Sequence, residues 1–204
     1  MRLSSRTLFL MRALLGGALA GFIVLATGVF RHEGFAFDAP ILAWLYAHRS
    51  SALDQTARLL TLSASAKVLA PLSLALLLWL WYRKGRWTFF LLGVGGASVL
   101  SLLMKEVFSR GRPHLFPALM PEKDYSFPSG HALGSMALAL ALGFAVLDTH
   151  PSVGRLVLAL GAFWSLMVGL SRLYLQVHYP SDVLAGFLVA MGWVFGLYLW
   201  MRKN

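Results

Sequence analysis

The sequence contains no cysteine and few charged residues, and both shortages narrow the kinds of protein that it can encode. Without cysteine no disulfide bond can form, and the redox state of the protein's compartment cannot be read from the chain. Charged residues make up 13% of the chain, whereas a soluble domain has about 25%. Hydrophobic residues make up 58%, and the mean hydropathy is +0.70. This composition argues against an ordinary soluble domain and points to a chain that lies in a lipid bilayer.

Acidic residues are also scarce, because the chain has 8 of them against 18 lysines and arginines, for a net charge of +10. In a soluble protein such an excess would suggest that nucleic acid is the partner. In a membrane protein, basic residues concentrate in the loops that remain in the cytoplasm. We therefore expect membrane lipids, and no nucleic acid, as partners of this chain.

Six apolar runs are long enough, or nearly so, to cross the roughly 30 Å of hydrocarbon in a bilayer. They cover approximately Ala13–Phe30, Lys67–Tyr82, Trp87–Met104, Ala132–Leu147, Leu156–Leu170 and Val183–Met201. No internal repeat or low-complexity tract divides the chain. The pattern predicts a single all-α membrane domain over residues 1–204, with six transmembrane helices.

The first run also has features of a cleavable signal peptide. Basic residues precede an apolar stretch that contains the small-residue sequence Ala18-Leu19-Ala20. However, Arg12 interrupts the apolar region, and hydrophobicity continues past Ala20 to Phe30. We therefore expect the first run to be retained as a transmembrane helix.

The charges between the runs predict the orientation of the chain. The candidate cytoplasmic segments hold nine basic residues and one acid, Asp148; the nine are Arg2, Arg6, Arg12, Arg83, Lys84, Arg86, Arg155, Arg202 and Lys203. The opposite side holds the other nine basic residues and the other seven acids. The positive-inside tendency then places both termini in the cytoplasm and the segment Arg31–Ala66 outside. Its FDAPILAWLYAH part is expected to form either an interfacial amphipathic helix or a covering loop.

The remaining polar residues fall into three groups that this topology brings to the outer side. They are Lys105–Pro113 at the end of the third run, Pro128–His131 at the start of the fourth, and Ser171–Asp182 between the fifth and sixth. A single lysine or arginine at such a place would simply extend to the interface. Three basic residues that converge with two histidines have instead the composition of a phosphate site.

The second group lies in the stretch YSFPSGH, which reads as a loop that opens a helix. Pro128 disfavours helical geometry at Phe127, and Ser129 can cap the helix that follows. Free backbone N–H groups at a helix start attract anions, and His131 can donate or accept a proton at neutral pH. The stretch therefore predicts an anion pocket that contains an acid–base group.

The two histidines of these groups differ in their neighbours. Asp182 follows His178 by four residues, and its carboxylate can hold one imidazole nitrogen as N–H while the other keeps a lone pair. His131 has no acid at comparable spacing. We predict that His178 is a nucleophile and that His131 donates a proton to the leaving oxygen.

Taken together, the three groups resemble the signature of the type 2 phosphatidic acid phosphatase superfamily, which is K-x6-R-P, P-S-G-H and S-R-x5-H-x3-D. All three motifs are complete and in order, as Lys105–Pro113, Pro128–His131 and Ser171–Asp182. A PSGH tetrapeptide alone arises by chance, but three motifs with fixed internal spacing and a consistent topology are a specific signal. Many relatives have glycine where this chain has Gln176, a difference that lies outside the signature.

The resemblance implies a phosphatase that needs no metal and no cofactor and passes through a phosphohistidine. In the family pattern Lys105, Arg112 and Arg172 hold the phosphoryl oxygens, assisted by Ser129 and the N–H group of Gly130. His178 attacks phosphorus, Asp182 orients it, and His131 protonates the leaving group before it activates water. A metal site formed by the histidines and Asp182 is an alternative, but the three nearby cations would repel a divalent ion.

The expected protein is thus a multi-pass lipid phosphatase of the bacterial inner membrane, with its active site facing the periplasm or cell exterior. Undecaprenyl diphosphate and phosphatidylglycerol phosphate are the substrates that small bacterial relatives suggest first, followed by phosphatidic acid and a lipid A phosphate. A lipid phosphotransferase would use the same intermediate. A non-enzymatic anion transporter would need the basic residues but not a nucleophile–carboxylate pair with a second histidine.

Overall fold

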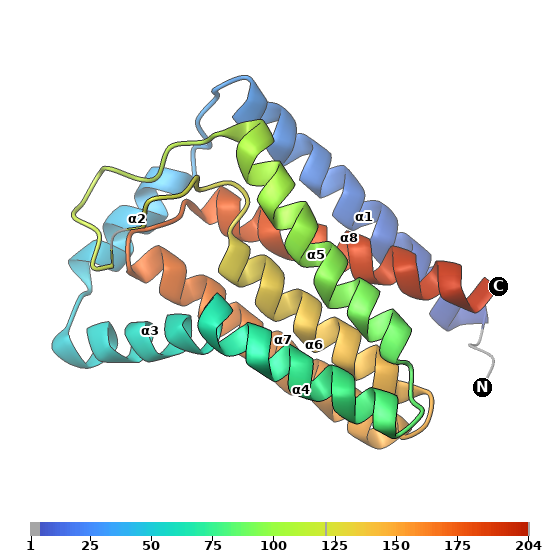
Figure 1. Cartoon of the computed structure of the whole chain (residues 1–204). Coiled ribbons are helices and arrows are strands. Elements are labelled where there is room, and N and C mark those ends of the chain that lie inside the picture. Colours follow the sequence, from blue (N-terminus) through green and yellow to red (C-terminus); the bar gives the residue numbers. More distant parts are fainter. Residues whose placement is uncertain (1–4, 121, 204) are drawn as a thin grey trace.

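The computed structural model describes residues 5–120 and 122–203, and this part of the chain folds entirely as α-helices and their connections. The helices are α1 (Ser5–Phe30), α2 (Asp38–Ala47), α3 (Ser51–Ser63), α4 (Ala66–Tyr82), α5 (Trp87–Phe108), α6 (Gly130–Leu147), α7 (Pro151–Tyr174) and α8 (Pro180–Lys203). The long helices run roughly side by side as a bundle (Figure 1). The all-α fold class is therefore confirmed.

Five helices within the described residues are long and apolar enough to cross a membrane: α1, α5, α6, α7 and α8. The predicted run Lys67–Tyr82 corresponds to α4, which has only 17 residues. Together with α3 it forms a pair bent by 43°, which brings the number of spans to six if the pair is one broken span. The sequence did not predict α3 as part of a span because Asp54 and Arg58 interrupt its apolar residues.

Helix α6 is the centre of the bundle, and 72% of its 18 residues are buried. It packs against α5, α7 and α8, and its gold ribbon lies among theirs in Figure 1. Small residues permit this close packing. A Cβ atom added at Gly161 of α7 would lie 2.5 Å from the Cβ of Ala139 on α6. Because α6 is buried among its neighbours, it can be apolar on all sides.

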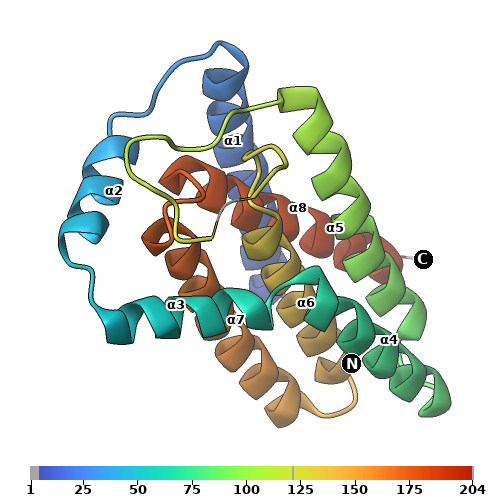
Figure 2. The same cartoon turned by 60° about the vertical axis from the view of Figure 1, so that its left-hand side comes forward.

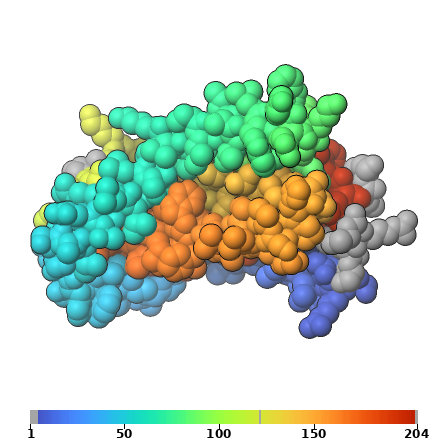
Figure 3. Space-filling view, turned by 90° about the horizontal axis from the view of Figure 1, so that it is seen from below, coloured from blue at the N-terminus to red at the C-terminus, as the bar shows by residue number. Residues whose placement is uncertain are grey.

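Large apolar side chains cover much of the outer surface, as expected of helices that face lipid rather than water. Examples on four different helices are Val24, Leu74, Leu102 and Phe163, each more than half exposed. In the space-filling view of Figure 3, α3 and α4 run along one side, next to the exposed flank of α7. The multi-pass membrane character predicted from composition is thus reflected in the surface of the folded chain.

One end of the bundle gathers residues from the segments that were predicted to be cytoplasmic. Arg86, at the start of α5, places Nη1 2.9 Å from Oδ2 of Asp148, which follows α6. Arg202, near the end of α8, contacts the other oxygen of Asp148. Arg2 of the same predicted group lies outside the described residues. These contacts bring three of the segments to the same end, whereas the side of the membrane that this end faces remains a prediction.

The opposite end of the bundle is where α5 and α7 finish and α6 and α8 begin (Figure 1). The segment Arg31–Ala66 packs there, with α2 and α3 flanking the connections between the long helices (Figure 2). Its FDAPILAWLYAH part forms a helix, α2 (Asp38–Ala47), and not a loop. The expected amphipathic character was wrong, because the apolar residues are spread around all sides of this helix. Its location at the membrane interface stays a prediction.

Candidate active site

Lys105 and Arg112 reach the end of the bundle from either side of a sharp turn. Helix α5 ends at Phe108, and Ser109 follows in left-handed geometry with φ of 43°. This turn leads the chain across the bundle end, so that Arg112 comes to the region where buried Lys105 points. Both cations contact Asp124: Nζ of Lys105 lies 2.7 Å from its Oδ2, and Nη2 of Arg112 contacts its Oδ1.

Arg172 reaches the same region from the last turn of α7. Its side chain is 1% exposed, and a buried guanidinium requires partners for its donors. The Nη1 group donates to the hydroxyl of Thr61 on α3, and Nη2 contacts Oε1 of Glu122. Glu122 also contacts Arg112, whose Nη2 lies 2.9 Å from its other oxygen. The three predicted phosphate-binding cations are therefore neighbours, linked by two carboxylates.

The oxygens of these two carboxylates accept hydrogen bonds from the three cations, as the oxygens of an anionic ligand would. Burial alone would raise the pKa of Glu122, but the adjacent Arg172 and Arg112 hold it below its ordinary value. The pKa of Asp124 is likewise lowered, because Lys105 and Arg112 outweigh the effect of burial. Both side chains are thus ionised at neutral pH and neutralise much of the positive charge of the site.

His178 is buried beside these cations, with 1% of its side chain exposed. Its Nε2 atom lies 3.2 Å from Nη1 of Arg112. A guanidinium can only donate hydrogen bonds, so this contact requires a lone pair on Nε2 and places the imidazole proton on Nδ1. Nδ1 faces Asp182, whose Oδ2 lies 3.5 Å away. His178 therefore presents an unprotonated nitrogen to the cation cluster and its N–H group to a carboxylate.

The environment of His178 keeps the imidazole neutral. Burial lowers its pKa, and the charges of Arg172, Arg112 and Lys105 lower it further, to well below the ordinary 6.5. A neutral imidazole is the nucleophilic form. The cations that would bind an anion therefore also maintain the lone pair beside it.

The turn that carries His178 is itself unusual. Gln176 has a φ of 59°, in the left-handed region that glycine adopts more readily than other residues. Its buried side chain compensates, because Nε2 donates to the carbonyl oxygen of Leu42 on α2 at 3.1 Å and to that of Leu173 at 3.3 Å. The backbone at this position thus favours glycine, the residue that the resemblance implies here.

The start of α6 forms the facing wall of the site. Ser129 occupies the N-cap position, but its side chain makes no capping hydrogen bond, and its buried Oγ has no partner within the described residues. Its backbone N–H donates to the carbonyl oxygen of Asp182 at 3.0 Å. A Cβ atom at Gly130 would lie 3.7 Å from Cε of Lys105. Ser129 and Gly130 therefore lie between the cation cluster and the first turn of α8.

His131 follows in the first turn of α6 and is half-buried. It is close enough to Arg172, Glu122, Lys105 and Arg112 for their charges to act on it. All eight side chains and backbone groups that the sequence singled out are thus brought to this end of the bundle. The roles assigned to them remain predictions.

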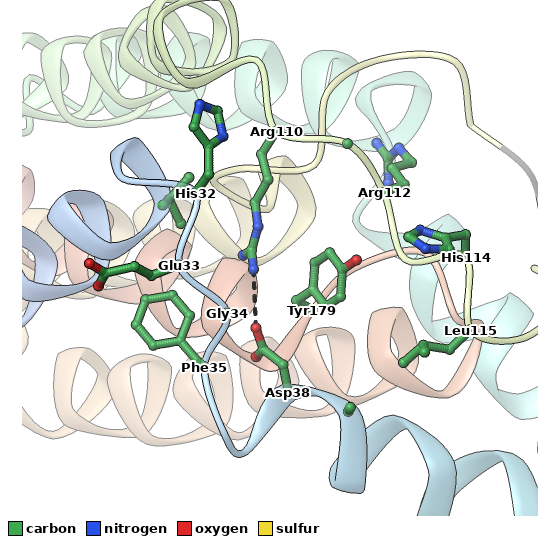
Figure 4. Close-up of a pocket in the computed structure, with 13 residues that line it drawn as sticks. His32, Glu33, Gly34, Phe35, Asp38, Arg110, Arg112, His114, Leu115 and Tyr179 are labelled. Atoms are coloured by element: carbon green, nitrogen blue, oxygen red, sulfur yellow. Dashed lines mark hydrogen bonds and ion pairs between the residues drawn. The ribbon is translucent and has the colours of Figure 1, made fainter.

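The sequence reasoning missed Arg110 and Asp38 in this region, in addition to Asp124 and Thr61. Arg110 lies 2.5 Å from Oδ1 of Asp182 through Nη1 and 3.1 Å from Oδ2 of Asp38 through Nη2. Arg110 and Asp38 line a pocket of about 420 Å³ between the α1–α2 connection and the segment that follows α5 (Figure 4). Arg110 lies inside the first motif, at a position that the signature leaves open. Asp38 had no signal, because its partners Arg110 and Ser181 lie 72 and 143 positions away in the sequence.

Comparison with known proteins places this arrangement in a family. The model of the PAP2 superfamily matches residues 86–204, more than half of the chain. The chain belongs to the PAP2 superfamily. The matched region contains all three motifs, and with them His178, His131 and the three cations. The resemblance to type 2 phosphatidic acid phosphatases seen in the motifs is therefore confirmed.

Similar PAP2 proteins act on lipid phosphates. Phosphatidylglycerophosphatase B of Bacillus subtilis is 26% identical over 175 residues, covering 83% of this chain and 86% of the relative. Undecaprenyl-diphosphatase BcrC of the same organism is 30% identical over 152 residues, covering 71% and 73%. The crystal structure of a transmembrane PAP2-type phosphatidylglycerolphosphate phosphatase from Bacillus subtilis matches with a TM-score of 0.83 at 25% identity, covering 93% of this chain and 96% of that one. The chain is a membrane lipid phosphatase of the PAP2 type.

Proposed function

We propose that this PAP2 phosphatase removes phosphate from a lipid monoester or diphosphate headgroup through a phosphohistidine at His178, without a metal ion. The observation that carries the proposal is the contact between Nε2 of His178 and Arg112, at 3.2 Å. It directs a lone pair into a cluster that also holds Lys105 and Arg172. Three fixed cations supply the positive charge that a metal ion supplies in other phosphatases.

The reaction then has two steps. Nε2 forms a bond to phosphorus while the bond from phosphorus to the lipid oxygen breaks, and His131 gives its proton to that oxygen. Lys105, Arg112 and Arg172 bind the phosphoryl oxygens, together with the Ser129 hydroxyl and the Gly130 N–H group. Water next attacks phosphorus and gives a proton to His131, the N–P bond breaks, and free phosphate and neutral His178 are released.

For the substrate we propose undecaprenyl diphosphate or phosphatidylglycerol phosphate. Support comes from the relatives named above, two of which act on these lipids according to their names. Phosphatidic acid and a lipid A phosphate are the next candidates. We further propose that the site faces the periplasm or cell exterior, with both termini in the cytoplasm. The segments predicted to be cytoplasmic carry nine basic residues against one acid, whereas the opposite segments carry nine against seven.

The test is a comparison of purified wild-type protein, His178→Ala and His131→Ala in EDTA, with these lipid phosphates and an aryl phosphate, each labelled with ³²P. We expect wild-type hydrolysis in EDTA, no covalent label in His178→Ala, and an accumulating acid-labile label in His131→Ala with the aryl phosphate. Its good leaving group needs no acid, whereas the second step lacks its base. A label in His178→Ala but not in His131→Ala would exchange the two roles. Transfer of phosphate to an added lipid instead of water would identify a phosphotransferase.

A further inference from the structure

Asp38, in the first turn of α2, is a buried carboxylate whose oxygens are both occupied. Only 5% of the residue is exposed, and a buried charge is costly unless it is fully paired. Oδ1 accepts the backbone N–H of Ser181 at 2.9 Å. Oδ2 accepts the Ser181 hydroxyl at 2.7 Å and Nη2 of Arg110 at 3.1 Å. Asp38 therefore binds one of the backbone N–H groups that the start of α8 leaves without a partner in its own helix, that of Ser181, from a different part of the chain.

Arg110 connects this carboxylate to a second one. Its Nη1 group donates to the Ser181 hydroxyl at 2.8 Å and to Oδ1 of Asp182 at 2.5 Å. Its guanidinium also lies over the ring of Tyr179, 4.2 Å from the centroid. Figure 4 shows the Arg110 side chain extending toward Asp38, with Tyr179 beside it. The planar fork is thus fixed by two carboxylates and an aromatic ring.

The two oxygens of Asp182 have different partners. Oδ1 is taken by Arg110, whereas Oδ2 accepts the backbone N–H of Tyr179 at 2.8 Å and is the oxygen that faces His178. Rotation of the carboxylate would break the contacts on both oxygens. Arg110 therefore helps to hold the carboxylate of Asp182 in the orientation that turns Oδ2 toward Nδ1 of His178, 3.5 Å away.

We propose that Asp38 and Arg110 are positioning residues that act on the nucleophile through the carboxylate of Asp182. Helix α2 of the outer segment is then part of the catalytic apparatus rather than only a cover over it. The inference rests on the proposed role of His178 as nucleophile and extends that role to residues outside the three motifs.

The first test is Asp38→Asn, which keeps the shape of the side chain but removes the charge that holds Arg110. We expect kcat to fall about 10–100-fold, as when outer hydrogen-bond partners of a ligating histidine are removed. KM should remain close to that of the wild type, because Lys105, Arg112 and Arg172 are untouched. Arg110→Lys should behave alike, since a point charge cannot bridge two carboxylates.

The matched control is Asp54→Asn, the same chemical change in the same outer segment. Asp54 accepts a hydrogen bond from the hydroxyl of Tyr174 at 2.7 Å and so anchors α3 to α7 without contacting Asp182. Its loss should leave kcat within about twofold of the wild type. An equal fall in Asp54→Asn and Asp38→Asn would overturn the proposal, because loosening of the segment would then explain both.

The deciding measurement is a double-mutant cycle with Asp182→Asn, with thermal unfolding in detergent recorded for every variant. If Asp38 acts through the Asp182 carboxylate, Asp38→Asn should have little further effect on kcat once that carboxylate is gone. If kcat of the double variant fell by the product of the two single factors, the proposal would be overturned. A rise in KM at unchanged kcat in Asp38→Asn would also overturn it. Labelling of His131→Ala with the aryl phosphate is measured alongside, because the phosphoenzyme should accumulate in that variant. Absence of the label would refute the role of His178 and this inference together, whereas its presence with a multiplicative cycle would refute this inference alone.

Discussion

Nη1 of Arg112 lies 3.2 Å from Nε2 of His178, so the cation that would bind a phosphoryl oxygen and the atom that would attack phosphorus are direct neighbours. The same Nη1 group donates to the carbonyl oxygen of Val177 at 2.6 Å, and Nε donates to that of Asp124 at 2.8 Å. These backbone contacts fix the plane of the guanidinium independently of any ligand.

Arg112→Ala should therefore lower kcat/KM strongly, by roughly the 2–4 kcal/mol typical of one oxyanion donor. Arg112→Lys should restore only part of this loss, because the compact ammonium group of lysine lacks the planar fork that reaches Val177, His178 and Asp124 together. Lys123→Ala, an exposed basic residue in the same connection, is the control and should retain activity within about twofold. Steady-state kinetics with a lipid phosphate measure all three. Full activity of Arg112→Lys would contradict a role for the fork.

Removal of the Glu122 carboxylate should strengthen anion binding. Glu122 neutralises Arg172 and Arg112, and a phosphate must compete with it for both. In Glu122→Gln the inhibition constant of vanadate should fall by up to about tenfold, which corresponds to ~1.4 kcal/mol. Glu106→Gln, an exposed glutamate next to Lys105 in the sequence, should leave it unchanged. Weaker vanadate binding in Glu122→Gln would instead indicate that the carboxylate orients the arginines.

The low pKa of His178 predicts the pH dependence of the first chemical step. A lowered pKa means that the neutral imidazole persists as the pH falls through 6.5, the ordinary value for histidine. Rapid-quench labelling of His131→Ala with an aryl phosphate isolates this step, because that leaving group needs no acid. After correction for ionisation of the substrate, the rate should stay nearly constant from about pH 7.5 to 6. Loss of half the rate near pH 6.5 would show that His178 titrates normally.

Gly186 allows α8 to contact the start of α6. A Cβ atom there would lie 2.7 Å from the carbonyl oxygen of Ser129, a backbone atom that cannot move aside easily. Gly186→Ala should lower stability by about 1–3 kcal/mol through overpacking and should also reduce kcat by displacing the PSGH segment. Gly196→Ala on the same helix, where the nearest side-chain atom would be 3.9 Å away, should do neither. Thermal unfolding and kinetics of the two variants provide the comparison.

The proposed orientation can be tested directly because the chain has no cysteine. A single cysteine at Lys123, in the connection before α6, should react with an impermeant thiol reagent in intact cells. A cysteine at Arg83, after α4, should react only after the membrane is permeabilised. Both positions are exposed, so access rather than burial decides the result. The reverse pattern would place the active site in the cytoplasm.

The sequence was most informative where local rules apply. The motifs predicted that Lys105, His131 and His178 would come together, because the spacing of the apolar runs determines which loops share an end of the bundle. It could not predict the Asp38–Ser181 contact, which joins residues 143 positions apart and depends on how α2 packs against α8. The capping role expected of Ser129 was wrong for a related reason: a serine before a helix indicates a cap, and only the folded geometry shows that this one makes no such bond.

The left-handed backbone at Gln176 couples the turn that carries His178 to the docking of helix α2. A glycine would allow this turn to form by itself, whereas Gln176 stabilises it through a hydrogen bond to Leu42 of α2. Undocking of α2 leaves the amide of Gln176 without that partner while the unfavourable φ remains. Helix α2 and the turn that carries His178 should therefore open together as one cooperative unit, and amide hydrogen exchange should report the same opening free energy for both.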